Sequence, residues 1–335
     1  MADKALNAKK YQKSALISDL LPLGGLIAVV ILFGILTKGK IFSSFSLQTI
    51  YNQSFLYILG GLGCAFLFAQ GAIDLSMGAV IALCSILGAF AANQYGIIAC
   101  ILVCLIVGTI CGTITGFIYS HTNIAVFILG LSVCFLIKGT LYQITNGQAS
   151  ISIPYADKKM FTPIWISAVV MVVFALIIYY LFEYHTMGKH SKAIGAGIAA
   201  AAQSGVDVTK IKWLGFVISG FTCGMVAFFT MVKTGSGGPA TGSNFEFNVM
   251  IAMILGGMPS EGGARAKIKS CFIGAILIAF YSNGMVLLGA DSRVQEILKG
   301  VVFIVVIVGT YRMQMQAEGK KAFQFFGLKL AKKNG

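Results

Sequence analysis

The amino-acid sequence predicts an all-α, polytopic integral membrane protein with about ten transmembrane helices. Apolar residues make up 57% of the 335 residues and charged residues only 11%, against about 25% in an ordinary soluble domain. The apolar stretches reach about 20 residues and lack the alternation of barrel strands. Lipid must therefore cover much of the surface, and helices must satisfy the backbone hydrogen bonds internally.

The apolar stretches define the expected spans. The eighth is the shortest, at about 13 residues, and whether it crosses the membrane fully stays open. The expected spans are residues 20–37, 49–69, 77–93, 96–119, 124–143, 162–182, 212–232, 245–257, 268–288 and 294–311.

Lysine and arginine residues set the expected orientation. They gather in segment 1–19, loop 183–212, loop 258–269 and tail 313–335, which about ten spans would place on one side. By the positive-inside rule this side is the cytoplasm, so we expect both termini there and a bacterial cytoplasmic membrane location. The segment 1–19 resembles no cleavable signal peptide, because the apolar run after it is too long.

A few basic residues fall outside this pattern. Lys38 and Lys40 are expected on the outer side. Lys138 lies late in the fifth span and is expected to snorkel to the outer interface. The net charge of +14 does not indicate nucleic-acid binding, because the basic residues follow the loops and form no separate face.

The sequence contains no recognisable catalytic or metal-binding pattern. It lacks a phosphate-binding loop of the form GxxxxGK[ST], since Gly188 and Lys189 are followed by His190. The histidines are few and scattered, and the eight cysteines lie within apolar stretches, where we interpret them as packing residues. We expect no catalytic residue, no metal and no cofactor bound by this chain.

Small residues predict close helix packing. Gly108, Gly112 and Gly116 repeat at four-residue spacing in the fourth span, as do Gly220 and Gly224 in the seventh. In lipid such spacing lets two helix backbones approach each other. The sequence shows no internal repeat that would independently indicate a transporter.

Polar residues within the apolar stretches are candidates for a solute path. In GAIDLS, residues 71–76, Asp74 interrupts two apolar runs; it either lines the path or caps the helix that begins near Ser76, close to the inner surface. A glycine-rich outer loop leads into the short eighth span with Glu246 and Asn248, either as a solute site or as an ordinary loop. Further candidates, each also able to form an interhelical hydrogen bond, are Asn52, Gln53, Gln70 and Asn283.

The loop 183–212 holds a candidate contact for a partner protein. Residues 194–203 are expected to form a short helix outside the membrane, ended by Gly205. It is either a linker or a surface that another protein pushes. The candidate coupling residues are Ile194, Gly195, Ala199, Ala200, Gln203, Ser204 and Gly205.

Several segments together resemble the permeases of bacterial monosaccharide importers driven by ATP-binding cassette (ABC) proteins, the ribose, xylose and galactose group. Nucleoside and branched-chain amino-acid permeases are more distant relatives of that group. The resemblance covers about residues 20–312, the expected permease domain. It rests on GAIDLSMGAVIAL (71–83) and on segments 123–148, 187–212, 254–268 and 283–304.

The resemblance implies partners and a mechanism. It implies a second permease, as a homodimer or heterodimer, and two ABC ATPase subunits or one fused ATPase that bind ATP and Mg²⁺. It also implies an external solute-binding protein and loop 183–212 as the coupling segment. The sequence departs from the family at Gly197–Ala199 and at Ala264 before Arg265, on the ATPase-facing side. We therefore hypothesise one half of a heterodimeric pair.

Other functions remain open at this level. The chain fits an ABC permease for a sugar, with a nucleoside or another small solute as an alternative. An ion-coupled secondary transporter would need paired intramembrane acids, and the expected topology places Asp74 and Glu246 near opposite faces. A membrane scaffold subunit would need neither a coupling segment nor a polar path.

Overall fold

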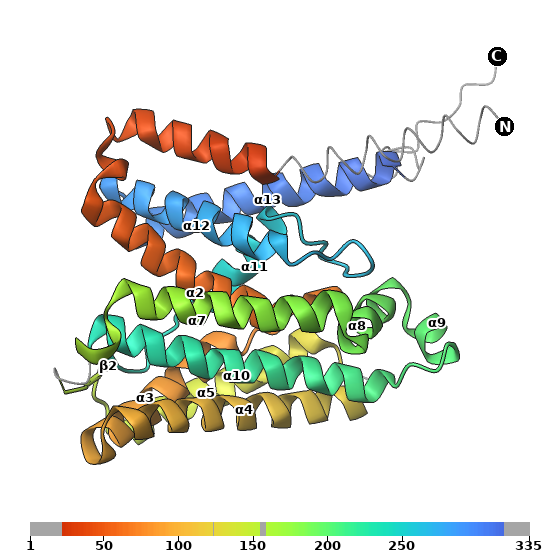
Figure 1. Cartoon of the computed structure of the whole chain (residues 1–335), viewed down its shortest axis with the longest axis horizontal. Helices are drawn as coiled ribbons and strands as arrows, with labels where there is room; N and C mark the ends of the chain where they lie inside the picture. The colour runs from red at the N-terminus through yellow and green to blue at the C-terminus, as the bar shows by residue number, and fades with distance from the viewer. Residues whose placement is uncertain (1–21, 123, 155–158, 318–335) are drawn as a thin grey trace.

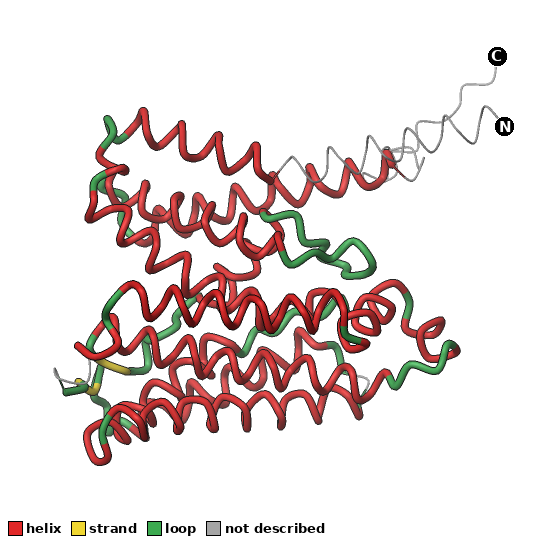
Figure 2. Tube along the Cα trace, in the orientation of Figure 1, coloured by secondary structure: helices red, strands yellow, loops and turns green. Residues whose placement is uncertain are grey.

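The computed structural model describes residues 22–122, 124–154 and 159–317, and these residues form a bundle of helices that run roughly side by side (Figures 1 and 2). The expected segment 1–19 and most of the expected tail 313–335 lie outside the described residues. The apolar helices of the first half are Pro22–Leu36, α2 (Ser44–Ala69), α3 (Met77–Tyr95), α4 (Ile97–His121) and α5 (Val126–Ile144). Those of the second half are α7 (Ile164–Tyr179), α10 (Val208–Thr234), α11 (Phe245–Leu255), α12 (Lys269–Leu287) and α13 (Ser292–Ala317).

The order of these helices follows the spans expected from the sequence, which confirms the all-α membrane fold. In the described part, seven helices are long and apolar enough to cross a membrane, and Pro22–Leu36 and α11 are shorter apolar helices. The remaining short elements are η1 (Lys40–Phe42), β1 (Ile151–Ser152), the π-helix η2 (Tyr180–Tyr184), α8 (Thr186–Ala196), α9 (Ile198–Gln203) and β2 (Ser236–Gly237).

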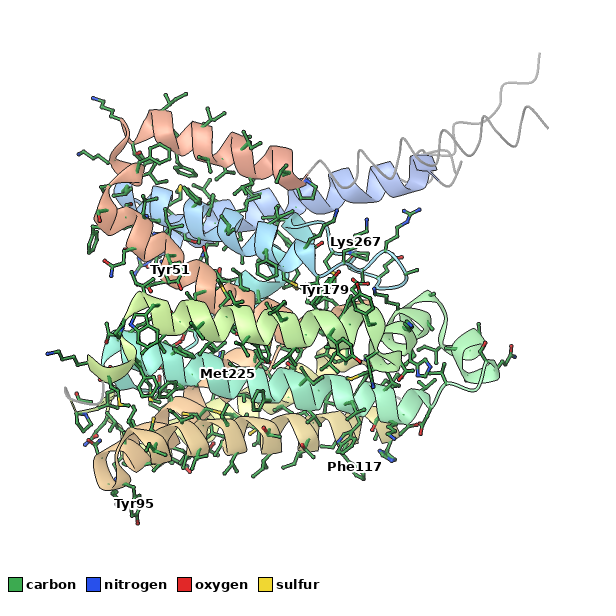
Figure 3. All side chains as sticks on the ribbon, in the orientation of Figure 1. Tyr51, Tyr95, Phe117, Tyr179, Met225 and Lys267 are labelled. Atoms are coloured by element: carbon green, nitrogen blue, oxygen red, sulfur yellow. The ribbon has the colours of Figure 1, made fainter. Side chains whose placement is uncertain are left out.

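The bundle has two distinct ends. Helices α8 and α9 lie at one end, together with loop 256–268, which carries Lys267 (Figures 1 and 3). The antiparallel pair of β1 and β2 lies at the other end, where Tyr95 closes α3. We call these the α9 end and the β2 end. Loops 183–212 and 258–269 thus share one end, as the distribution of basic residues predicts.

Helix α2 forms the centre of the bundle. Its residues from Ile58 to Ala69 are all buried, and it packs against α7, α10, α11 and α12. Helices α4, α5 and α7 lie outside, and most of their residues are partly or fully exposed. In α4 the large exposed residues recur every four positions, as Ile98, Leu102, Ile106, Ile110 and Ile114. Lipid is the solvent that such a surface requires.

The inward stripe of α4 consists of small residues, as the sequence predicts. Gly108 lies against the backbone of Gly220 and Gly224 in α10, and Gly112 lies against Phe216 and Gly220. Cys100 and Cys104 extend the same buried stripe. Since lipid tails compete equally for apolar side chains, this close backbone packing is what holds α4 against α10.

The two halves of the chain repeat one arrangement in opposite orientation. Helix α2 packs against α12, and its counterpart α10 packs against α4. Likewise α3 contacts α4 and α5, and α11 contacts α12 and α13. Helix α2 runs toward the α9 end, whereas α10 runs away from it (Figure 1). The fold therefore has the inverted repeat found in many transporters, although the sequence shows no repeat.

We expect Gly112→Ala to destabilise the protein by about 1–3 kcal/mol, because the new methyl group would overlap the Phe216 carbonyl of α10. Thermal unfolding of the purified protein in detergent measures the change. Gly139→Ala in α5 is the matched control, since a Cβ there meets nothing within 4 Å. Equal stability of the two variants would contradict the packing described for α4 and α10.

Candidate functional site

Helices α2 and α3 are separated by a break at residues 70–76, which turns the chain back into the bundle. Gly71 adopts a positive φ of 73°, which favours glycine. The Asp74 Oδ1 atom accepts hydrogen bonds from the Ser76 N–H at 2.8 Å and from the Ser76 hydroxyl at 2.6 Å. The N-cap of α3 is Ser76, so the expectation that Asp74 caps this helix is wrong; Asp74 instead closes the turn before it.

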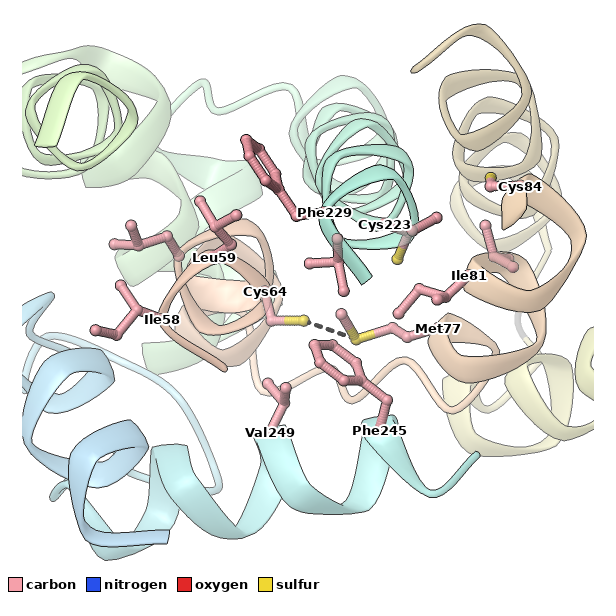
Figure 4. Packing of buried hydrophobic residues seen from close by; sticks show 14 of the residues in the cluster. Ile58, Leu59, Cys64, Met77, Ile81, Cys84, Cys223, Phe229, Phe245 and Val249 are labelled. Atoms are coloured by element: carbon pink, nitrogen blue, oxygen red, sulfur yellow. Dashed lines mark hydrogen bonds between the residues drawn. The ribbon is translucent and has the colours of Figure 1, made fainter. Parts of the chain in front are cut away.

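Helix α3 begins deep within the bundle. Its first residue, Met77, contacts Cys64 of α2, with the two sulfur atoms 3.0 Å apart. Phe245, the first residue of α11, packs against Gly60 of α2. Figure 4 shows Cys64, Met77, Phe245 and Val249 around one point of the core. Both α3 and α11 therefore start inside the bundle, beside the second half of α2.

Segment 235–244 brings α11 to this depth. Its residue Gly237 lies against the Ser85 carbonyl in α3, and Gly242 lies against Ile81 and Gly78. The segment thus runs along α3 from its middle to its first turn. Helix α11 starts only at the end of this segment and has 11 residues. At about 1.5 Å per residue it covers about half of the hydrocarbon thickness, so the eighth expected span is too short to cross the membrane as a helix.

Glu246 occupies the space that Gly78 leaves open. It lies in the first turn of α11, is 5% exposed, and its carboxylate would overlap any Cβ at Gly78. Its Oε2 atom is buried without a hydrogen-bond partner among the described residues. Glu246 also interacts electrostatically with Asp74. The expectation that these acids lie near opposite faces is therefore wrong, because α3 and α11 both start beside the second half of α2 and Glu246 lies against Gly78 in the first turn of α3.

One lysine lies within electrostatic reach of Glu246, and a second binds the next polar residue of α11. Lys138 of α5 is exposed and interacts electrostatically with Glu246 and with Cys134. Lys299 of α13 donates a hydrogen bond to Asn248 Oδ1 at 3.0 Å. One turn earlier, Glu296 accepts a hydrogen bond from Asn244 at 2.6 Å.

These contacts form two groups around the first turn of α11, one with Asp74, Glu246 and Lys138 and one with Asn248, Glu296 and Lys299. The two groups lie on different sides of α11, since Glu246 and Asn248 are two residues apart. We call both groups together the central polar cluster. It contains three of the residues expected to line a path, namely Asp74, Glu246 and Asn248. Sequence reasoning missed Glu296 and Lys299. Their signal was the presence of opposite charges three residues apart inside an apolar span.

The other expected path residues lie elsewhere. Asn283 donates hydrogen bonds to the Ser46 hydroxyl at 2.7 Å and the Ser46 carbonyl at 3.2 Å, and it ties α12 to the start of α2 near the β2 end. The backbone carbonyl of Asn52 accepts a hydrogen bond from Lys233. The buried Gln53 Oε1 atom has no hydrogen-bond partner among the described residues. Gln70 lies at the α9 end, where it bonds to α8 and α10.

The expected coupling segment forms two helices rather than one. Gly197 separates α8 from α9, so the predicted single helix over 194–203 is wrong, although α9 ends just before Gly205 as predicted. Ile194 is buried in α8, and Gly195 lies against the backbone of Ala69. The exposed members of the set are Ala199, Ala200, Gln203, Ser204 and Gly205, which project at the α9 end (Figure 1).

Comparison with known proteins gives the setting of this site. Residues 46–307 match the family described as "Branched-chain amino acid transport system / permease component". The chain is 26% identical to the ribose import permease protein of Escherichia coli strain K12 over 92% of its own length and 98% of the relative. It is 29% identical to the ribose import permease protein of Bacillus subtilis strain 168, over 90% and 95% respectively. It is 27% identical to the D-allose transport system permease protein of E. coli strain K12, over 83% and 87%. No solved structure matches the chain.

The contact between Gly78 and Glu246 can be tested by substitution. We expect Gly78→Ala to lower the free energy of unfolding by about 1–3 kcal/mol, because its methyl group would displace the Glu246 carboxylate. The same change in a Glu246→Ala background should cost less, and the cost that remains comes from the Gly242 carbonyl oxygen, which would lie 2.5 Å from the new Cβ. Thermal unfolding of the four proteins gives this double-mutant cycle, and strictly additive effects would rule out the contact.

Proposed function

Because the chain belongs to the family of transport-system permease components, we propose that it is the permease subunit of an ABC importer for a small sugar. One observation carries the choice of a sugar. The similarity to proteins named as ribose import permeases extends over nearly the full length of both chains. A relative named for L-arabinose, 29% identical, supports the same class of solute.

The proposed orientation places the α9 end in the cytoplasm. Lys189, Lys192 and Lys210 lie in or beside α8 and α9, and Arg265 and Lys267 lie in the neighbouring loop at this end. Such a concentration of basic residues favours the cytoplasmic side. The β2 end then faces outward, where an external binding protein would deliver the solute, and the chain spans the bacterial cytoplasmic membrane with both termini inside.

We further propose that ATPase subunits dock on α9. Its exposed residues project beyond the other helices and offer a surface without large apolar side chains apart from Ile198. The partner is either two ATPase subunits or one fused ATPase, and ATP and Mg²⁺ would bind to this partner. A second permease would complete the complex, and the departures at Gly197–Ala199 favour a heterodimer with a second, different permease.

The central polar cluster is the proposed place of solute passage. It lies where α3 and α11 begin, so the first turns of two helices come together at Gly78 and Glu246, with charged side chains on either side of α11. Hydroxyl groups of a sugar can both donate to carboxylates and accept from lysines. The Glu246 Oε2 atom, which is buried and has no hydrogen-bond partner among the described residues, supplies one such acceptor.

A second candidate function would use the same pair of acids. Asp74 and Glu246 now lie within electrostatic reach of each other at broken helices, as an ion-coupled secondary transporter would require. The two functions differ in their energy source. The secondary transporter would move solute with an ion gradient alone, whereas the ABC permease depends on ATP hydrolysis by a partner.

Reconstitution separates these functions. The chain is purified with candidate ATPase subunits, inserted into lipid vesicles, and assayed for ATP hydrolysis with and without a sugar-loaded binding protein. We expect the loaded binding protein to stimulate hydrolysis several-fold and solute to accumulate only with ATP. A variant without residues 198–204 is the control, since loss of α9 should abolish ATPase docking. Uptake driven by an ion gradient without any ATPase would reject the ABC assignment.

The orientation has its own test. The native cysteines are buried, apart from the partly exposed Cys111, so an introduced cysteine can be labelled selectively in a background with Cys111→Ala. We expect Lys40→Cys to react with a membrane-impermeant thiol reagent in intact cells, and Gln203→Cys only after the membrane is permeabilised. The reverse pattern would place the α9 end outside.

A further inference from the structure

The last turn of α2 joins the α9 end of the molecule to the central break. The Gly263 N–H donates a hydrogen bond to the Ala69 carbonyl at 2.9 Å. Gly195 of α8 lies so close to the same carbonyl that a side chain would collide with it. A Cβ on Gly71 would lie 2.7 Å from the Glu261 carbonyl oxygen. Helix α8 and loop 256–268 therefore both touch the backbone of residues 69–71.

Gln70 adds side-chain hydrogen bonds to this contact. It is 7% exposed, and its Nε2 atom donates to the Ser191 hydroxyl of α8 and to the Ile211 carbonyl of α10, both at 3.2 Å. Gly215 of α10 leaves the space that the amide occupies. Gln70 thus connects α2, α8 and α10. Ser191 precedes α9 in the chain and Ile211 follows it, so the two hydrogen bonds lie on either side of α9.

Very little chain separates this contact from the polar cluster. Asp74 follows Gln70 by four residues, and the intervening Ala72 is buried and bonded to the Leu67 carbonyl. Contacts between backbones have no flexible side chains to absorb a displacement, because the packed interior is dense. A shift of α8 must therefore either move residues 69–71 or break the hydrogen bonds that hold them.

We propose that Gln70 is a positioning residue for coupling, which links movement of α8 and α9 to the break that carries Asp74. This role rests on the proposed function as an ATP-driven permease. It replaces the sequence-based assignment of Gln70 to the solute path. The junction consists of residues 69–71 with Gly195, Ser191, Ile211 and Gly263.

The Gln70 amide uses only half of its hydrogen-bonding capacity at this junction. Its Oε1 atom is buried without a hydrogen-bond partner among the described residues. A buried acceptor that lacks a donor is costly, so an arrangement that supplies a donor gains stability. Coupling requires an element with two arrangements that the partner protein can bias. The half-satisfied amide provides such an element at the point where α8, α10 and the break meet.

The chain offers a closely matched control for this role. Asn283 is also a buried amide whose nitrogen donates to a serine hydroxyl and to a backbone carbonyl, but it lies near the β2 end. Gln70→Met and Asn283→Leu each remove such a pair of hydrogen bonds and keep a similar side-chain volume. A purely structural role predicts similar consequences for both variants.

The test uses the reconstituted complex with its ATPase and a sugar-loaded binding protein. We expect Gln70→Met to lower the number of solute molecules imported per ATP hydrolysed at least three-fold, with the ATPase still bound and basal hydrolysis retained. Asn283→Leu should leave this ratio unchanged, even where it lowers the melting temperature. Ser191→Ala removes only one hydrogen-bond partner of Gln70, so we expect it to lower the number of solute molecules imported per ATP by less. It replaces Gln70→Met in the test if that variant does not fold.

The outcomes separate this role from the function on which it rests. An unchanged ratio in both Gln70→Met and Ser191→Ala, or an equal loss in Asn283→Leu, would overturn the coupling role while the wild-type complex still imports solute. A changed concentration dependence for solute at an unchanged ratio would return Gln70 to the path. Failure of the wild-type complex to couple hydrolysis to import would reject the proposed function, and the role of Gln70 with it.

Discussion

The constraint on which this structure depends is that a membrane offers no hydrogen-bond partner to a broken helix. Segments 70–76 and 235–244 are both non-helical, and both lie inside the bundle. The first is closed by the Asp74 side chain, and the second lies along the backbone of α3. Irregular backbone at such depth is tolerated only when protein surrounds it. The burial of α2 and the apolar exterior of α4 and α7 follow from the need to enclose these two segments.

Glycine has two different uses in this enclosure. Between α4 and α10 it lets two long helices lie in contact over several turns, which fixes their relative position. At residues 69–71 it lets a loop and a short helix touch the end of α2 from outside the membrane region. The first contact is extensive and resists movement, whereas the second is confined to one turn. A displacement at the α9 end is therefore expected to move the break before it separates the long helices.

The sequence predicts the helices well because lipid imposes their length and hydropathy. It also predicts the glycine crossing of α4 and α10, since spacing by four residues places small side chains on one face. It fails for the depth of Glu246, because hydropathy treats each apolar stretch as starting at a membrane surface. The start of α11 beside Gly60 depends on how segment 235–244 packs, and no local pattern records that. The break at Gly197 was missed for the related reason that an alanine-rich stretch has high helix propensity on both sides.

Charge balance within the central polar cluster bears on what passes through it. An isolated carboxylate at this depth would hold a proton or a cation, because burying a lone charge is expensive. Here Glu246 has Lys138 within electrostatic reach, and on α13 the charges of Glu296 and Lys299 lie one turn apart. With Asp74 the cluster holds three carboxylates and two lysines, so it is rich in hydrogen-bonding groups and its charges largely offset one another. An uncharged solute with many hydroxyl groups gains hydrogen bonds from such a surface without disturbing its charge balance, whereas a cation would compete with the lysines. This balance favours an uncharged solute over ion coupling at the same residues.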